Sequence, residues 1–222
     1  MERYQEAHHP WVYRSTRFAL QSLFRAVYSL RIIGKENLPT SGPCVLAPSH
    51  HLRSFQDPPF AGIAVKGRPV FFMAKSELWT EPKLKPLGKF IGLLGAFPVK
   101  RGMGDRDAYE KAKQVVSDGK ILGIFGENTR VEGEDLGEIY SGIGHFAVRA
   151  NCQVVPVGMH ISEKRKLLRR RGRVVIGEKI IPKSDPDMSL AEKKADVMAR
   201  FVPALDEVYR QARELADSAS NT

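Results

Sequence analysis

Apolar residues recur at helical spacing near the start of the chain, which predicts an amphipathic helix over residues 11–31. One face of this helix carries Leu20, Leu23, Phe24, Val27 and Leu30. Another face carries Arg14, Arg17, Gln21 and Arg25. Gly34 and Pro39 end the helical pattern. Arginines beside an apolar face suit either a lipid headgroup layer or a helix packed on a protein core with solvated arginines.

From residue 44 onward the apolar positions form short uninterrupted runs, which are typical of strands buried on both faces of a sheet. The predicted strands are Cys44–Ala47, Val70–Ala74, Ala96–Val99, Lys120–Phe125, Val154–Met159 and Val174–Ile176. Helical patterns lie at Asp105–Val116 and at Leu190–Leu215, where Pro203 is expected to kink or divide the helix. In the first of these, Asp105 is the expected N-cap and Gly119 follows the end.

Strands that alternate with helices predict an α/β fold, with a mostly parallel central sheet flanked by helices in a single domain. We expect residues 1–40 to form an N-terminal amphipathic, membrane-associating helix and residues 41–216 to form the folded domain. Residues 217–222 are expected to be a flexible polar tail.

The composition narrows the class of protein without selecting a function. The 222 residues carry a net charge of +10 and 42% hydrophobic residues, which excludes a disordered or collagen-like chain. Cys44 and Cys152 each lie beside an apolar run, which suggests buried thiols in a reducing compartment. The longest apolar run, Phe90–Val99, is too short to cross a bilayer. The charge is compatible with nucleic acid, anionic membrane or a phosphorylated substrate.

Polar residues able to do chemistry follow several of the predicted strands, where α/β folds place functional groups. The four segments of interest are residues 49–58, residues 97–102, residues 125–130 and residues 154–158. In the first segment His50 and His51 precede Asp57, and a carboxylate can orient an imidazole that exchanges a proton near neutral pH. Each segment alone is also compatible with an ordinary turn or strand end, and the fourth is apolar enough to be purely structural.

Cations and hydroxyl-binding groups dominate the second and third segments. Lys100 and Arg101 end a strand before a glycine, which suits a phosphate or carboxylate clamp. Glu127, Thr129 and Arg130 crowd one turn, an arrangement suited to a polyol phosphate.

The order of these segments resembles the glycerophospholipid acyltransferase family, which includes the 1-acylglycerol-3-phosphate acyltransferases. That family has a His-(four residues)-Asp motif followed by blocks of the types Phe-Pro-Val-x-Arg, Phe-Pro-Glu-Gly-Thr-Arg and Val-Pro-Val. The resemblance covers roughly residues 44–178, with residues 73–78 and 174–178 included. Two departures stand out. Five residues separate His51 from Asp57, and in the third block Gly126 and Asn128 replace the usual Pro and Gly.

The resemblance implies transfer of a fatty acyl group from acyl-CoA to a hydroxyl of lysophosphatidic acid, giving phosphatidic acid. His51 would be the base, with His50 as the alternative, and Asp57 would orient it. The residues implied in binding the phosphate and glycerol are Lys75, Arg101, Glu127, Thr129 and Arg130. The resemblance implies neither a cofactor nor a metal, and acyl-CoA serves as co-substrate.

Alternative acceptors are glycerol 3-phosphate, another lysophospholipid or a glycolipid. An alternative of another class is a non-catalytic basic protein that binds membrane or nucleic acid, supported by seven cations within residues 164–173. This run is also compatible with a solvated hairpin tip. No nucleic-acid motif is evident, so we expect an anionic membrane as partner and no nucleic acid. The expected location is peripheral, on the cytoplasmic face of a membrane of bacterial type, without a transmembrane helix.

Overall fold

The computed structural model describes residues 9–49, 57–65, 67–100, 105–127, 136–166 and 169–218. The strands are β1 (Tyr28–Ile33), β2 (Cys44–Pro48), β3 (Val70–Lys75), β4 (Phe97–Val99), β5 (Ile121–Gly123), β6 (Gln153–Lys166) and β7 (Arg169–Ile176). The helices are α1 (Pro10–Val27), η2 (Lys35–Asn37), α2 (Asp57–Ala64), α3 (Glu77–Thr80), α4 (Lys85–Leu93), α5 (Arg106–Ser117), α6 (Gly142–Arg149) and α7 (Leu190–Asp217).

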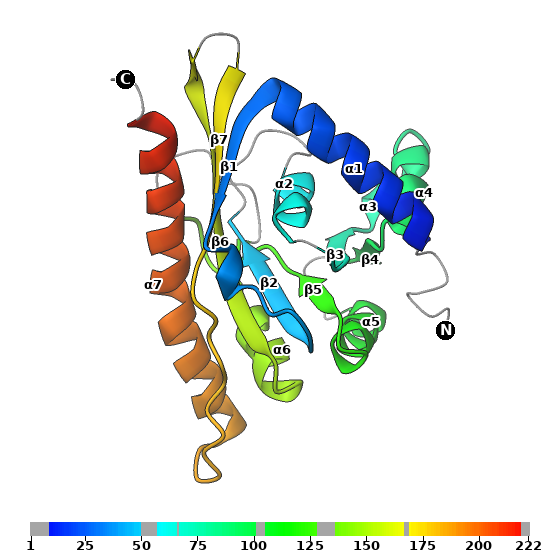
Figure 1. Ribbon diagram of the computed structural model, residues 1–222. Helices are drawn as coiled ribbons and strands as arrows, with labels where there is room; N and C mark the ends of the chain where they lie inside the picture. The colour runs from blue at the N-terminus through cyan, green and yellow to red at the C-terminus, as the bar shows by residue number, and fades with distance from the viewer. Residues whose placement is uncertain are drawn as a thin grey trace.

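All seven strands belong to one sheet, in the order β1-β7-β6-β2-β5-β3-β4 (Figure 1). The strands from β6 to β4 run parallel to one another, whereas β7 pairs antiparallel with β6 and parallel with β1. The mostly parallel α/β sheet predicted from the apolar runs is therefore confirmed, with two reversed strands at one edge.

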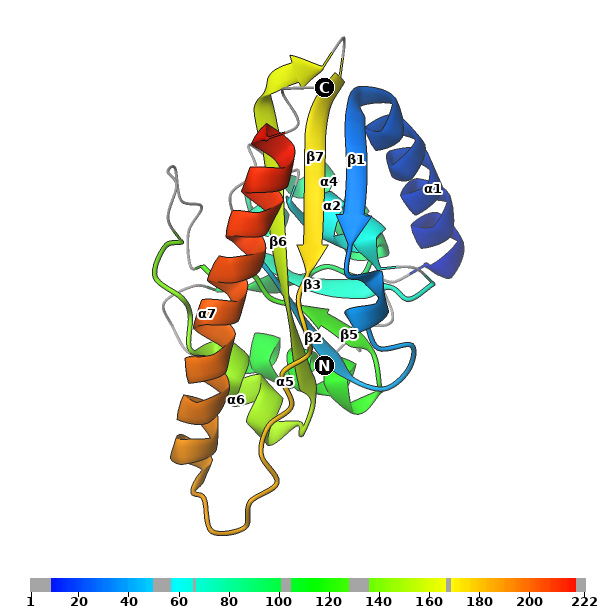
Figure 2. The ribbon, with the colours of Figure 1, turned by 60° about the vertical axis from the view of Figure 1, so that its left-hand side comes forward.

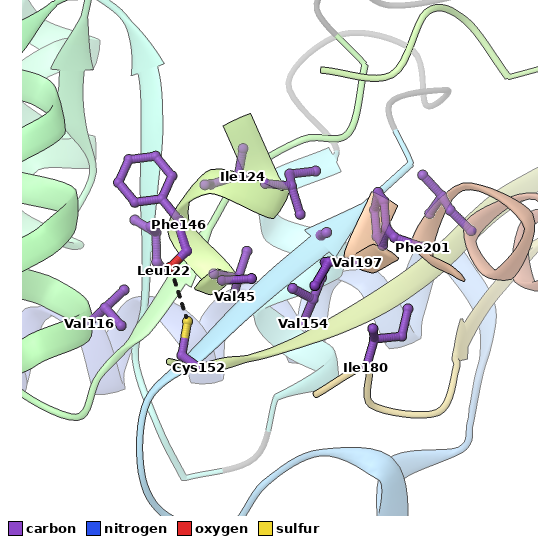
Figure 3. Packing of buried hydrophobic residues seen from close by; sticks show 14 of the residues in the cluster. Val45, Val116, Leu122, Ile124, Phe146, Cys152, Val154, Ile180, Val197 and Phe201 are labelled. Atoms are coloured by element: carbon purple, nitrogen blue, oxygen red, sulfur yellow. Dashed lines mark hydrogen bonds between the residues drawn. The ribbon is translucent and has the colours of Figure 1, made fainter. Parts of the chain in front are cut away.

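Alternate side chains of the central strands point to opposite faces of the sheet, as the two-residue period of a strand requires. In β2, Val45 and Ala47 join the core under α5, α6 and α7, whereas Cys44 and Leu46 join the core under α1 and α2. Figure 3 shows part of the first core, where Cys152 Sγ lies 3.8 Å from the carbonyl oxygen of Phe146. Both cysteines are buried and free, and burial raises the pKa of each thiol to about 12.

The first helix is shorter than predicted. It ends at Val27, and Tyr28–Ile33 form the strand β1 against β7, so the prediction of helix up to residue 31 is wrong. The apolar residues of this stretch are compatible with the period of a helix and with that of a strand. Pairing with β7, which is distant in the sequence, determines that they form a strand. The predicted division of the chain at residue 40 stays a prediction. Among the described residues, no helix has the length and apolar content needed to cross a membrane.

The last helix, α7, lies along β6 and β7 (Figure 2) and runs unbroken from Leu190 to Asp217. Pro203 therefore does not divide it. An internal proline costs about 3 kcal/mol. Buried side chains at Phe201, Leu205 and Val208 flank it, and each contributes about 1.5–3 kcal/mol by leaving water. Of the tail predicted at residues 217–222, Asp217 is still the last residue of α7, and residues 219–222 lie outside the described residues.

Local capping signals in the sequence are reproduced in the structure. Asp105 caps α5, and its carboxylate accepts a hydrogen bond from the backbone amide of Ala108 at 3.1 Å. Ser189 and Glu192 form a reciprocal capping box at the start of α7. Gly119, with φ of 68°, follows the end of α5 as expected.

Candidate active site

The carboxyl ends of β2, β5, β3 and β4 lie side by side at one edge of the sheet. Leu46 and Phe72 are both register partners of Gly123, and Lys75 is the partner of Val99. The described parts of three of the four sequence segments lie at these strand ends, with Ser49 after β2, Lys100 after β4 and residues 125–127 after β5. Such an edge is where open parallel sheets bind ligands.

Two described residues bracket the first segment. Ser49 is fully buried, and its backbone amide donates to the carbonyl oxygen of Val157 at 2.8 Å. The Ser49 hydroxyl oxygen accepts from the amide of Met159 at 3.1 Å. Asp57 is also fully buried and occupies the first turn of α2, where the helix dipole favours a carboxylate. Both histidine candidates, His50 and His51, lie outside the described residues.

The second segment lies beside the end of β3. Lys75 is the exposed last residue of that strand, and the amide of Ser76 donates to the carbonyl oxygen of Val99 at 3.0 Å. The Asp105 carboxylate accepts from the amide of Lys100 at 2.8 Å, so the cap of α5 also holds the chain directly after β4. Arg101 itself lies outside the described residues.

The backbone of the third segment is hydrogen-bonded to the end of β2, directly before the first segment. The amide of Gly126 donates to the carbonyl oxygen of Pro48 at 3.2 Å. A proline, usual at this position in the family, has no such amide. A side chain on Gly126 would also meet Leu205 of α7 at 2.9 Å. Glycine at this departure from the family pattern is therefore explained by the packing of this fold.

Glu127, near the end of this segment, contacts residues that follow the stretch 128–135. Its side chain is only 3% exposed, and Oε1 accepts a hydrogen bond from the amide of Gly137 at 3.3 Å. Its backbone forms an isolated antiparallel bridge with Ile139. Thr129 and Arg130 belong to the intervening residues, which lie outside the described ones. Of the predicted site residues that the structure describes, Lys75 ends β3, Glu127 follows β5, and Asp57 begins α2, the helix that comes after β2 in the chain.

The fourth segment is structural, as its apolar character indicates. Val154, Val155 and Val157 are buried in the centre of the sheet. A side chain at Gly158 would lie 2.1 Å from the carbonyl oxygen of Val208, because α7 packs directly on the strand backbone. Within the described ranges, no group of three or more His, Cys, Asp or Glu side chains is placed to hold a metal ion.

Part of the basic run at 164–173 faces the protein. Arg171 and Arg173 of β7 are buried, and burial lowers the pKa of Arg173. Arg171 donates to the carbonyl oxygen of Ala216 at 3.2 Å, and Arg173 donates to that of Ser29 at 2.7 Å. A solvated hairpin tip is therefore the wrong description for these two residues. Sequence reasoning also missed Ser49, whose only signal is a hydroxyl between an apolar strand and the histidines.

Comparisons with known proteins show the family to which the chain belongs. A family model described as Acyltransferase matches residues 29–160. The 1-acyl-sn-glycerol-3-phosphate acyltransferase of Bacillus subtilis (strain 168) is 27% identical over 169 residues, covering 75% of this chain and 81% of the relative. The chloroplastic 1-acyl-sn-glycerol-3-phosphate acyltransferase BAT2 of Brassica napus is 30% identical over 134 residues, covering 59% of this chain and 37% of the relative.

Among solved structures, the 1-acyl-sn-glycerophosphate (LPA) acyltransferase PlsC from Thermotoga maritima superposes with a TM-score of 0.66. The match covers 93% of this chain and 80% of that one at 21% identity. At this identity the likeness shows the fold, and it matches the α/β arrangement described above.

Proposed function

Because this chain belongs to the Acyltransferase family, we propose that it transfers a fatty acyl group to a hydroxyl of 1-acylglycerol 3-phosphate, giving phosphatidic acid. The main support from the structure is the fully buried side chain of Asp57 at the start of α2, together with Lys75 at the end of β3 and the buried Glu127 after β5. The printed names of the Bacillus and Brassica relatives support the acceptor.

In the proposed reaction, His51 takes the proton from the acceptor hydroxyl as its oxygen attacks the acyl carbonyl carbon. A new C–O bond forms, the C–S bond of the thioester breaks, and the proton passes from the imidazole to the leaving thiolate. Asp57 orients the imidazole and stabilises its charged form. The acceptor is itself the nucleophile, so the step needs no covalent enzyme intermediate.

The acceptor headgroup would be held by the cations and hydroxyl-binding groups at the same edge. Lys75, Arg101 and Arg130 would pair with the phosphate, since ammonium and guanidinium groups bind oxyanions strongly. Glu127 and Thr129 would hydrogen-bond the glycerol portion. The Glu127 carboxylate can accept further hydrogen bonds beside the one that it accepts from the Gly137 amide.

The assay that tests this proposal supplies purified protein with labelled acyl-CoA and a panel of acceptors. The panel contains 1-acylglycerol 3-phosphate, glycerol 3-phosphate and other lysophospholipids, with positional analysis of the product. Acyl carrier protein thioesters, run in parallel, decide the donor. We expect turnover with 1-acylglycerol 3-phosphate and its loss in folded His51→Ala and Asp57→Ala variants. Wild-type rates in both variants would overturn the mechanism, and loss in His50→Ala alone would move the base to His50.

We further propose that the protein works as a peripheral protein on an anionic membrane, through the outward face of α1. Trp11 is 79% exposed and Phe18 is 72% exposed, and Arg14 lies over the Trp11 ring at 5.8 Å. A large apolar side chain contributes about 1.5–3 kcal/mol when it is fully removed from water. Basic residues add on the order of 1 kcal/mol each at an anionic surface.

Vesicle flotation tests the membrane proposal. We expect stronger binding to anionic than to neutral vesicles, and weaker binding after Trp11→Ala or Phe18→Ala. Equal binding to both vesicle types would contradict the electrostatic part. Unchanged binding in the two variants would contradict the role of α1. The matched control, Ser22→Ala, alters an exposed small residue of the same helix.

A further inference from the structure

Helix α1 has an inward face that contacts α2, β1 and β7 (Figure 1). The amide of His9 donates to the carbonyl oxygen of Leu93 at 3.1 Å, at the end of α4. Burial raises the pKa of Tyr13, and its side chain hydrogen-bonds the backbone of Val70 at the start of β3. These contacts connect the start of α1 to the end of α4 and to the amino end of β3, the strand that carries Lys75 at its other end.

An aromatic cluster fixes α1 against α2. The rings of Phe24 and Phe60 have centroids 4.8 Å apart, and those of Tyr28 and Phe60 are 5.4 Å apart. All three side chains are buried, and Gly172 of β7 leaves room for the Phe60 ring, which a side chain there would meet at 3.0 Å. Phe60 lies three residues after Asp57, so the two share a face of α2.

A hydrogen bond from a charged side chain of α1 holds the carboxyl-terminal end of α2. Arg17 Nη2 donates to the carbonyl oxygen of Ile63 at 3.3 Å, in the last turn of α2. A cation there complements the negative end of the helix dipole. Arg17 Nε is buried with no hydrogen-bond partner among the described residues. Arg17 therefore faces the protein, although the sequence pattern grouped it with the polar face of α1.

Helix α2 needs such external supports because it is only 8 residues long. Isolated helices shorter than about 12–15 residues are marginal in water, so packing determines where α2 lies. Its first residue is Asp57, and it follows residues 50–56 of the first segment. The position of the Asp57 carboxylate thus depends on what holds α2.

We infer that α1 is part of the catalytic apparatus, with Arg17 and Phe24 as positioning residues that act through α2 on Asp57. The inference rests on the proposed function and goes beyond membrane attachment. The outward face of α1 would meet lipid, while the inward face sets the geometry of the acid–base pair. Loss of an inward contact then lowers turnover even when no membrane is involved.

A double-mutant cycle between Arg17 and Asp57 tests this inference, with a water-soluble acceptor such as a short-chain 1-acylglycerol 3-phosphate below its micelle concentration. Arg17→Ala is expected to lower kcat about tenfold in the wild-type background, because small misplacements of catalytic groups have effects of this size or larger. In the Asp57→Asn background the same substitution is expected to change kcat less than twofold. Arg17→Lys, which keeps a donor for the Ile63 carbonyl, is expected to recover much of the loss.

The outcomes separate the inference from the function on which it rests. If Arg17→Ala lowers kcat equally in the wild-type and Asp57→Asn backgrounds, or does not lower it in the wild-type background, the positioning role is overturned while acyl transfer stays intact. A wild-type protein that turns over no acceptor, soluble or micellar, would overturn the proposed function and this inference with it. Thermal melting shows that each variant is folded at the assay temperature. Lys113→Ala, which removes an exposed cation on α5, is the control and is expected to leave kcat unchanged.

Discussion

The side-chain oxygen of Ser49 accepts a hydrogen bond from the backbone amide of Met159, at 3.1 Å in the buried centre of the fold. Strand β2 ends at Pro48, and the backbone amide of the next residue, Ser49, still donates to the carbonyl oxygen of Val157 in β6. The Ser49 hydroxyl adds a second hydrogen bond to β6, from the Met159 amide, directly before the two candidate histidines in the sequence. This bond fixes the chain two residues before His51, the proposed base.

Ser49→Ala is expected to lower the free energy of unfolding by about 1–3 kcal/mol, because the buried Met159 amide loses its acceptor. Ser49→Thr keeps a hydroxyl oxygen and is expected to lose less. Urea denaturation of both variants measures the difference, with the exposed Ser22→Ala as control. An Ala variant as stable as the wild type would contradict the anchoring role.

Substitutions of Glu127 are expected to separate a loop contact from a substrate contact. Glu127→Gln keeps a carbonyl oxygen for the Gly137 amide, so its stability should match the wild type while KM for the acceptor rises. Glu127→Ala should also lose about 1 kcal/mol of unfolding free energy. Denaturation and steady-state kinetics measure the two effects. A wild-type KM in the Gln variant would exclude the proposed glycerol contact.

Asp105→Ala is expected to lower the free energy of unfolding by about 1 kcal/mol at pH 7, the usual effect of losing an N-cap. Hydrogen bonding from the Lys100 amide lowers the pKa of Asp105, so the folded state favours the carboxylate. The stabilisation is therefore present at neutral pH and is lost as the pH falls below 3.8 through the folded-state pKa. Urea titrations at pH 7 and pH 3 should show a smaller difference between wild type and variant at pH 3.

The stability of the fold is expected to fall on mild acidification because of His145. Burial, with the nearby Arg149 and Lys194, lowers the pKa of His145 below its usual 6.5. The folded state thus binds the proton less readily than the unfolded chain does. This contribution is present above pH 6.5 and is lost as the pH falls through the folded value.

His145→Gln is expected to reduce the dependence of unfolding free energy on pH in that range, measured by denaturation between pH 7.5 and pH 5. The substitution also alters the contact of Nε2 with the Tyr109 hydroxyl at 3.3 Å, so Tyr109→Phe is the control for that contact. A variant with the same pH dependence as the wild type would show that other groups are responsible.

Local features of the fold were predictable because they depend on neighbours in sequence. The apolar runs predicted β2 and β3 within one residue of their observed ends, and Asp105 was recognised as a cap. The strand β1 was missed, because its existence depends on pairing with β7 more than a hundred residues away. The burial of Arg171 was missed for the same reason, since its carbonyl partner belongs to α7.

The candidate site was predictable as a set of segments but not as a geometry. Motif order singled out Asp57, Lys75 and Glu127, and strand topology explains why the ends of β3 and β5, where Lys75 and Glu127 lie, are neighbours. Nothing local to Arg17 signals its contact with Ile63, because that contact joins two helices that β1, η2 and β2 separate in the sequence. The roles of His51, Arg101, Thr129 and Arg130 stay predictions from the motifs.

Helix α1 passes into strand β1 without a connecting loop, at Val27 and Tyr28. Shortening the chain at its N-terminus to ease production would therefore remove an edge strand together with a surface helix. The backbone of β7 would then be open along its length, and an open edge pairs readily with other chains. A protein trimmed to Gly34 is expected to form insoluble aggregates during expression, even though the trimmed segment includes Trp11 and Phe18, the most exposed large apolar side chains among the described residues.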